Sequence, residues 1–154
     1  MSNTIETFIA KTSSGLEPVL FEELTQLGAL NCQLLNRSVQ FEGDFAMMYR
    51  ANYFCRTAIR ILWKVGSFTF ENNDQFYRQI YQFEAEKYLN YDGTLAISAT
   101  LNNTIFNTPL FASMLAKDAI CDRFRNTYND RPNVDKENPD VQFHLHIFNN
   151  ECHL

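Results

Sequence analysis

The period of the apolar residues changes repeatedly along this chain, and the alternation limits the folds that it can adopt. Leu20 and Leu24 recur at helical spacing. Ile59, Ile61 and Trp63 recur at every second residue, which is the spacing of one face of a strand. A chain that alternates in this way folds into helices packed on a sheet, because each helix must bury its apolar stripe against a neighbouring layer.

Capping and breaking residues set the boundaries of these segments. Thr108 and Pro109 predict the start of a long helix, and Pro132 predicts its end. The predicted strands are about 4–12, 32–42, 58–65, 94–101 and 141–147, with a further one barely begun at the end of the chain. The predicted helices are about 15–27, 44–57, 73–90 and 108–128. Their order is βαβαβαβαββ.

This order predicts an α+β protein of two units, with helices packed on a mixed sheet. Residues 1–57 look like a small ferredoxin-like unit, and residues 58–154 look like a second α/β unit. A length of 154 residues suits one ordinary domain or two very small ones. The last predicted strand is too short to be stable where it stops, so we expect the natural polypeptide to continue beyond Leu154.

The composition suits a folded protein of a reducing compartment. Hydrophobic residues make up 45% of the chain, which is enough for a core and excludes a disordered protein. No apolar run reaches the roughly 20 residues of a membrane-spanning helix, and the start of the chain lacks the regions of a secretion signal. We therefore expect a cytoplasmic protein without a membrane partner, whose four scattered cysteines are reduced.

The acidic total conceals a local excess of positive charge. The net charge is −5, which argues against a typical nucleic-acid binder. Between Asp44 and Glu71, however, the chain contains no acid. The cations of that segment are Arg50, Arg56, Arg60 and Lys64. On the predicted strand, Arg60 and Lys64 share one face about 13 Å apart. The segment is either a binding surface or an ordinary solvated face, and charge alone does not separate the two.

No group of residues has the spacing of a catalytic centre. The five glycines are too far apart for a phosphate-binding loop, and nothing singles out one cysteine as a nucleophile. His144 and His146 share one face of the last long strand, and with Cys152 and His153 they could form a metal site. Histidines on the polar side of a strand are more often simply solvated. We expect neither a metal nor a cofactor in this chain.

The predicted helix before Pro132 changes its apolar side halfway along. The apolar residues of its first half are Leu110, Phe111, Met114 and Leu115. Those of its second half lie about a quarter turn away and are Ile120, Cys121, Phe124 and Tyr128. The basic residues at this end are Lys117, Arg123, Arg125 and Arg131. They form either a cationic rim for phosphates, in which Asp118 and Asp122 hold the arginines, or an exposed half-helix with ordinary ion pairs.

Several separated motifs resemble those of one protein family. The motifs are Gly15-Leu-Glu17, Glu22-Glu-Leu24, Leu27-Gly28, Arg56-Thr-Ala-Ile-Arg60, Lys117-Asp-Ala-Ile-Cys-Asp-Arg-Phe-Arg125, Arg131-Pro-Asn-Val-Asp135 and Pro139-Asp140. They resemble the THUMP domain, with its preceding ferredoxin-like unit, of the large-subunit ribosomal RNA guanine-N2 methyltransferases, which are often labelled N6-adenine-specific DNA methylases. The resemblance covers essentially the whole chain. The family commonly has glycine before Arg-Pro, where this chain has Asp130, which tolerates left-handed backbone better than most residues.

The resemblance implies a function. It implies a ferredoxin-like unit followed by a THUMP unit that binds RNA, above all large-subunit ribosomal RNA. It also implies that a family profile of the THUMP domain could match from as early as residue 43. In this family a Rossmann-type methyltransferase domain that uses SAM follows. Its glycine-rich loop and its Asn/Asp-Pro-Pro-aromatic motif are absent from this sequence, whose prolines are never adjacent. We therefore expect the catalytic domain, and SAM with it, to lie outside these residues.

Two functions stay open on this basis. The first is an RNA-binding targeting module of a ribosomal RNA methyltransferase, in which six cations contact the RNA. These are Arg56, Arg60, Lys64, Lys117, Arg125 and Arg131. The alternative is a protein-docking or structural α+β domain without RNA binding, which the acidic total and the aromatic content support. A clustered basic surface favours the first function, and a large exposed aromatic patch in its place favours the second.

Overall fold

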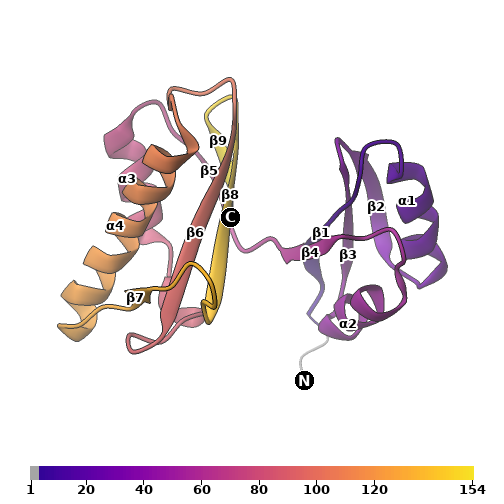
Figure 1. Cartoon of the computed structure of the whole chain (residues 1–154), viewed down its shortest axis with the longest axis horizontal. Coiled ribbons are helices and arrows are strands. Elements are labelled where there is room, and N and C mark those ends of the chain that lie inside the picture. Colours follow the sequence, from indigo (N-terminus) through magenta and orange to yellow (C-terminus); the bar gives the residue numbers. More distant parts are fainter. Residues whose placement is uncertain (1–3) are drawn as a thin grey trace. The chain divides into compact units, whose positions relative to one another are not determined.

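The computed structural model describes residues 4–154 and divides into two compact units, with the boundary after Val65. Each unit has its own sheet and its own pair of longer helices (Figure 1). The boundary in the structure lies eight residues later than the predicted boundary between residues 57 and 58. The physical reason is that the strand after residue 58 pairs with the first strand of the chain, and so completes the first sheet.

The first unit is a ferredoxin-like fold, as predicted. Its elements are β1 (Glu6–Lys11), α1 (Glu17–Gln26), β2 (Leu30–Leu35), β3 (Ser38–Gly43), α2 (Phe45–Phe54) and β4 (Arg60–Trp63). The sheet order is β2-β3-β1-β4, and all pairs are antiparallel. The prediction of one strand over 32–42 was wrong, because a tight turn at Arg37 (φ 52°) divides it into β2 and β3.

The core of this unit lies between the sheet and its two helices. Phe8 on β1 stacks on Phe41 on β3, with ring centroids 5.4 Å apart. Leu20 on α1 and Met47 on α2 are buried in the same cluster. Asp44 caps α2, as predicted, by accepting a hydrogen bond from the N–H of Met47 at 2.7 Å. Both helices therefore cover the face of the sheet that carries Phe8 and Phe41, and the alternate residues point to the opposite face.

The second unit has a mixed sheet with helices packed on it, as predicted, and its two longer helices lie on one face of that sheet (Figure 1). Its elements are β5 (Ser67–Thr69), α3 (Asn73–Gln82), the 3₁₀ turn η1 (Ala85–Lys87), β6 (Thr94–Asn102), α4 (Pro109–Tyr128), β7 (Asn133–Val134), β8 (Val141–Phe148) and β9 (Glu151–His153). The sheet order is β5-β9-β8-β6-β7. β6 runs parallel to β7 and β8, whereas β9 is antiparallel to β5 and β8. No helix within residues 4–154 is long and apolar enough to cross a membrane.

The long helix α4 begins and ends as predicted but turns an unexpected face to the core. Thr108 caps it by accepting a hydrogen bond from the N–H of Phe111 at 3.3 Å. The buried side of its first half consists of Ala112 and Ala116, while Leu110 is 65% exposed. Small residues let α4 lie close to α3 and β6, and Leu110, Phe111 and Met114 remain exposed, whereas Leu115 is partly buried.

Candidate nucleic-acid interface

Three cations lie on the face of the first sheet that is opposite to its helices. In the β1–β4 ladder Lys11 is opposite Arg60, and Ala10 is opposite Ile61. Ala10 is fully buried and Ile61 packs on the core, so the alternation of a strand places Lys11 and Arg60 on the other face. The N–H of Lys64 continues this ladder with a 2.9 Å hydrogen bond to β1, and Lys64 therefore shares that face. We call Lys11, Arg60 and Lys64 the sheet patch.

The charges of the sheet patch are available to a ligand. Like charges directly opposite each other in a sheet repel, so the pairing of Lys11 with Arg60 costs stability without a bound anion. Among the described residues, none of the three forms an ion pair. Glu42 on β3 is on the same face, but it lies two strands from Lys64, about 10 Å away. It accepts a 2.6 Å hydrogen bond from Asn31.

Arg56 lies outside the sheet patch, on the connection between α2 and β4. Its backbone N–H donates to Oε1 of Glu23 at 3.1 Å, and the hydroxyl of Thr57 donates to Oε2 at 2.6 Å. Burial acts to raise the pKa of Glu23, but these hydrogen bonds outweigh it and hold that pKa below its usual value. The contact ties the connection to α1 and leaves Arg56 exposed.

The other three predicted cations lie together on the second unit. Lys117, Cys121 and Arg125 are spaced four residues apart on α4, so they follow one side of the helix over about 12 Å. Arg131 lies beyond the end of the helix and folds back onto it. Its Nη1 lies 3.9 Å from Sγ of Cys121, between the positions of Lys117 and Arg125. We call Lys117, Arg125 and Arg131 the helix patch.

The turn after α4 makes this arrangement possible. Asn129 adopts the left-handed conformation (φ 57°) and donates its N–H to the carbonyl of Arg125 at 2.9 Å. Asp130, which stands where the family commonly has glycine, is not among the residues with positive φ. Its carboxylate accepts the backbone N–H of Arg131 at 2.8 Å. The left-handed position therefore falls on Asn129, and Asp130 fixes the backbone rather than the guanidinium of Arg131.

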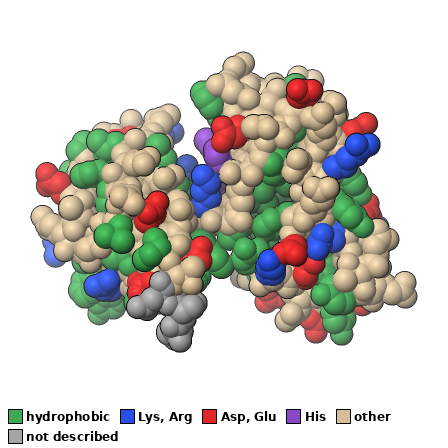
Figure 2. Space-filling view, turned by 180° about the vertical axis from the view of Figure 1, so that it is seen from behind, with side chains coloured by type: hydrophobic (Ala, Val, Ile, Leu, Met, Phe, Trp, Pro, Cys, Tyr) green, Lys and Arg blue, Asp and Glu red, His purple; other side chains and the backbone are tan. Residues whose placement is uncertain are grey.

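Carboxylates accompany the helix patch on the adjacent side of α4. Lys117 pairs with Asp118 at 2.5 Å, and Arg125 pairs with Asp122 at 2.9 Å. The second oxygen of Asp122 accepts a 2.6 Å hydrogen bond from the hydroxyl of Tyr77, which raises the pKa of Tyr77 to about 12. The Arg125 side chain is nevertheless 53% exposed. On the face that Figure 2 shows, Lys and Arg side chains of the second unit lie next to Asp and Glu side chains.

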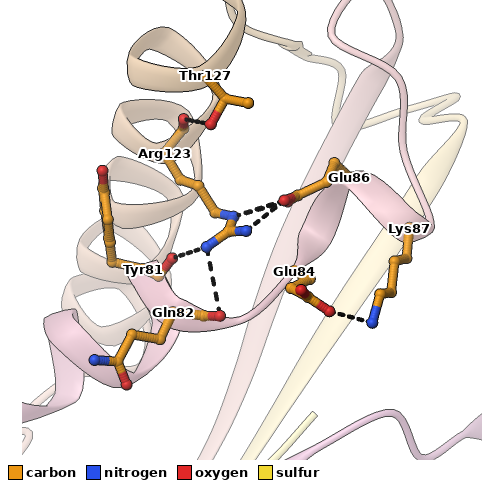
Figure 3. Close-up of polar contacts among 7 residues, drawn as sticks. All are labelled: Tyr81, Gln82, Glu84, Glu86, Lys87, Arg123 and Thr127. Atoms are coloured by element: carbon orange, nitrogen blue, oxygen red, sulfur yellow. Dashed lines mark hydrogen bonds and ion pairs between the residues drawn. The ribbon is translucent and has the colours of Figure 1, made fainter.

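Arg123, which the sequence grouped with this rim, has a structural role (Figure 3). Its Nε donates to both oxygens of Glu86, at 3.1 and 2.8 Å, and its Nη2 pairs with the same carboxylate. Its Nη1 donates to the carbonyl of Tyr81 at 3.0 Å and reaches that of Gln82 at 3.5 Å. The hydrogen bond from Arg123 holds the pKa of Glu86 below its usual value despite partial burial. This guanidinium joins α4 to the end of α3 and is committed to that contact.

The histidines do not form a metal site with cysteine. Ser98 lies opposite His144 in the β6–β8 ladder, and its hydroxyl is 2.8 Å from Nδ1 of that ring. His146 lies opposite His153 in the β8–β9 ladder. Cys152 points to the other face, where burial raises its pKa to about 12. Among the described residues, no cluster of histidine, cysteine and carboxylate side chains could hold a metal ion.

The structure thus groups the six predicted cations in two places. Arg60 and Lys64 lie on one sheet face, with Arg56 on a nearby connection of the same unit. The helix patch belongs to the other unit. Lys11 is a cation that the sequence analysis missed. The strand alternation of residues 4–12 puts it on the polar face, but only the pairing of β1 with β4 shows that it lies opposite Arg60.

Family models match both units. Residues 7–62 match the RlmL ferredoxin-like domain, and residues 70–154 match the THUMP domain, which starts later than the predicted limit of 43. The Ribosomal RNA large subunit methyltransferase K/L of Syntrophotalea carbinolica is 35% identical to this chain over 147 residues. The match covers 96% of this chain and 21% of that protein, so the chain spans about a fifth of this relative's length.

Solved structures share the fold. The crystal structure of a predicted N6-adenine-specific DNA methylase from Listeria monocytogenes str. 4b F2365 matches with a TM-score of 0.83 at 22% identity, over 97% of this chain and 39% of that one. The structure of TrmN from Thermus thermophilus matches with a TM-score of 0.70 at 18% identity, over 98% and 44%. At these identities the likeness concerns the fold alone. On the two family models, the chain belongs to the THUMP domain family, and an RlmL ferredoxin-like domain precedes its THUMP domain.

Proposed function

We propose that this chain is the RNA-binding targeting module of a SAM-dependent ribosomal RNA methyltransferase. It holds the RNA, and a separate catalytic domain methylates it. Large-subunit ribosomal RNA is the proposed target, since the name of the Syntrophotalea relative specifies that RNA. Guanine N2 is the proposed methylated position, on the resemblance described above. The place of action is then the cytoplasm.

The helix patch is the observation that carries this proposal. Lys117 and Arg125 lie along one side of α4 in the THUMP domain, and Arg131 reaches back to Cys121 on the same side. Arginine suits phosphate oxygens because its planar guanidinium can donate two parallel hydrogen bonds. Asp118 and Asp122 occupy the adjacent side, where they form ion pairs with Lys117 and Arg125 that RNA phosphates would have to compete with. Phosphate contacts of these cations position folded RNA through its backbone, without a base sequence being read.

The sheet patch supports the same function in the first unit. It presents Lys11, Arg60 and Lys64 without an ion pair among the described residues. A chain with net charge −5 binds RNA weakly on its own, and so the catalytic domain supplies part of the affinity of the whole protein. The exposed aromatic residues of α2 are the observation in favour of a protein-docking function, but they accompany a basic cluster and do not replace it.

The test is RNA binding by the chain and two triple variants. One variant carries Lys117→Ala, Arg125→Ala and Arg131→Ala, and the other carries Lys11→Ala, Arg60→Ala and Lys64→Ala. A matched control replaces Arg78, Lys87 and Lys136 by Ala and changes the net charge by the same amount. Binding of a labelled fragment of large-subunit ribosomal RNA is followed by fluorescence anisotropy.

We expect both site variants to bind at least about tenfold more weakly, because each lost phosphate contact removes a counterion-release term. The control should stay close to the unsubstituted chain. Equal loss in all three variants would mean that only net charge matters and that neither patch is a site. Full retention in both site variants would refute the assignment of these residues.

A further inference from the structure

The outer face of α2 is apolar where a helix of a folded domain is normally polar. The helix buries Met47 and Ala51 on its core side. On the opposite side Tyr49 is 67% exposed and Tyr53 is 83% exposed, and Phe54, the last residue of the helix, is 58% exposed. A helix that faces solvent carries charged residues on its outer side. A helix that is apolar on both sides is normally buried on both sides by other parts of the protein or by a partner. The exposed side of α2 is therefore suited to a partner.

The exposed residues form one continuous surface. Tyr49 and Tyr53 are four residues apart, as are Arg50 and Phe54, so the four side chains form two neighbouring rows along the helix. They line a shallow hollow of about 540 Å³, together with Asn52. The rings of Tyr53 and Phe54 meet edge to face, with centroids 4.9 Å apart, so each restricts the motion of the other. We call these five residues the aromatic face.

The charges around the aromatic face select the class of partner. From residue 45 to residue 70 the chain contains no carboxylate and four cations, in a protein of net charge −5. Arg50 lies within the face itself, and Arg56 follows the helix by two residues. Flat apolar rings beside Arg50 match the alternation of bases and phosphates in single-stranded RNA; the nearest acids named above, Glu23 and Asp44, are held by hydrogen bonds to the backbone at the two ends of the helix. A docked protein would need apolar contacts but no such one-sided charge.

We propose that the aromatic face of α2 is a stacking site for unpaired nucleotides of the RNA. Tyr49 and Tyr53 provide the surface for the bases, and Arg50 contacts the neighbouring phosphate. Every base has a flat π-face, so the site accepts single strands of differing sequence. The proposal rests on the RNA-binding function above and extends it. The sheet and helix patches hold the folded part of the RNA, and the aromatic face takes an unpaired segment.

The experiment uses the whole chain and two RNA probes with the same hairpin stem. One probe is blunt, and the other carries a single-stranded tail that contains 2-aminopurine, whose fluorescence is quenched when it stacks. The variants are Tyr53→Leu, which keeps apolar volume without a π-face, Tyr53→Phe, which keeps the ring, and the double change Tyr49→Ala with Tyr53→Ala. Leu110→Ala is the matched control, because Leu110 is 65% exposed on the other unit. The fluorescence of Trp63, the single tryptophan, verifies that the first unit is folded.

The chain should bind the tailed probe more tightly than the blunt one and quench the 2-aminopurine. Tyr53→Leu should weaken binding of the tailed probe by at least about fivefold, and the double variant by up to about 150-fold, the range for loss of a stacked base. Neither should change binding of the blunt probe. Tyr53→Phe and Leu110→Ala should behave as the unsubstituted chain.

Three outcomes overturn the proposal. If the chain binds both probes equally and the variants leave quenching unchanged, RNA binding stands and the stacking site does not. If the double variant changes only self-association in sedimentation, the face docks protein and not RNA. If the chain binds neither probe, the RNA-binding function itself fails and the stacking site fails with it.

Discussion

The substitution Arg123→Met tests whether this arginine stabilises the fold of the second unit. It thereby distinguishes Arg123 from the arginines that we propose to contact RNA. Methionine keeps the linear apolar stem but removes every hydrogen bond of the guanidinium. The carboxylate of Glu86 then loses its partner, and the carbonyls of Tyr81 and Gln82 lose a donor (Figure 3). Arg123 joins η1 and the end of α3 to α4, in addition to the hydrogen bonds of Tyr77 with Asp122 and of Asn126 with Tyr81.

The magnitude follows from the geometry. Removal of one partner of a buried ion pair costs about 3–5 kcal/mol, because the other charge is left uncompensated. Here the side chains of Arg123 and Glu86 are 21% and 22% exposed, so water can solvate part of the remaining charge. We therefore expect Arg123→Met to lower the free energy of unfolding of the second unit by about 2–4 kcal/mol at neutral pH. Arg123→Lys should recover little, since an ammonium cannot replace the bidentate geometry.

The assay is urea unfolding followed by two probes. Far-UV circular dichroism reports both units, whereas the fluorescence of Trp63 reports the first unit only. The dichroism midpoint should fall, and the Trp63 midpoint should stay constant. In the absence of urea the variant should bind RNA as tightly as the unsubstituted chain, whereas the triple variant of the helix patch should bind at least about tenfold more weakly.

The difference in the free energy of unfolding between the unsubstituted chain and Arg123→Met also depends on pH. The folded pKa of Glu86 is lowered, so its stabilising contribution is present above the ordinary value of 4.5 and is lost as the pH falls through the folded pKa. The unsubstituted chain should thus approach Arg123→Met in stability below about pH 4.5. A loss smaller than about 0.5 kcal/mol at neutral pH, or an equal shift of both midpoints, would refute the structural role of Arg123.

Three further predictions concern single sites. Glu23→Gln should destabilise the first unit at neutral pH but change its stability little in acid. The reason is that the lowered pKa of Glu23 contributes stability above pH 4.5, and protonation removes this contribution. The urea midpoint of Trp63 fluorescence, taken at neutral and at acidic pH, measures the effect. Gly43→Ala should lower the free energy of unfolding by about 1–3 kcal/mol, since the new Cβ would lie 2.7 Å from Cβ and Cγ of Met47; urea titration measures it. Iodoacetamide at pH 8 should modify the partly exposed Cys32 well before Cys152, whose pKa burial raises to about 12; peptide mass analysis decides, and comparable rates would contradict the burial of Cys152.

Local signals predicted the elements that begin and end on caps. Thr108, Pro109 and Asn129 marked α4 to within a residue, because their side-chain and backbone preferences act over one turn. The turn at Arg37 carries no comparable signal, and so β2 and β3 were taken for one strand. The boundary between the units depends on the pairing of β4 with β1, which joins residues far apart in the sequence. No local pattern specifies such a partner.

The same distinction between local signals and long-range contacts applies to the candidate site. The cations of α4 could be placed on one helix from their spacing alone, whereas the folding back of Arg131 onto Cys121 depends on the turn at Asn129. A helical wheel places Arg123 and Arg125 on different sides of α4, roughly 200° apart, but it does not show which of the two meets a carboxylate of another element. Glu86 lies 37 residues from Arg123, and only the packing of η1 against α4 brings the two together. Lys11 became a candidate in the same way, through its cross-strand neighbour.

The salt dependence of RNA binding tests the central claim most directly. If the chain holds phosphates through its two cationic patches, the logarithm of the association constant should fall linearly with the logarithm of the salt concentration. Loss of the helix patch should then make this slope shallower by about 2–3, at roughly 0.7–0.9 for each phosphate contact. The Arg78/Lys87/Lys136 control should keep the original slope. An unchanged slope in the helix-patch variant, or a flat dependence in the unsubstituted chain, would contradict the claim.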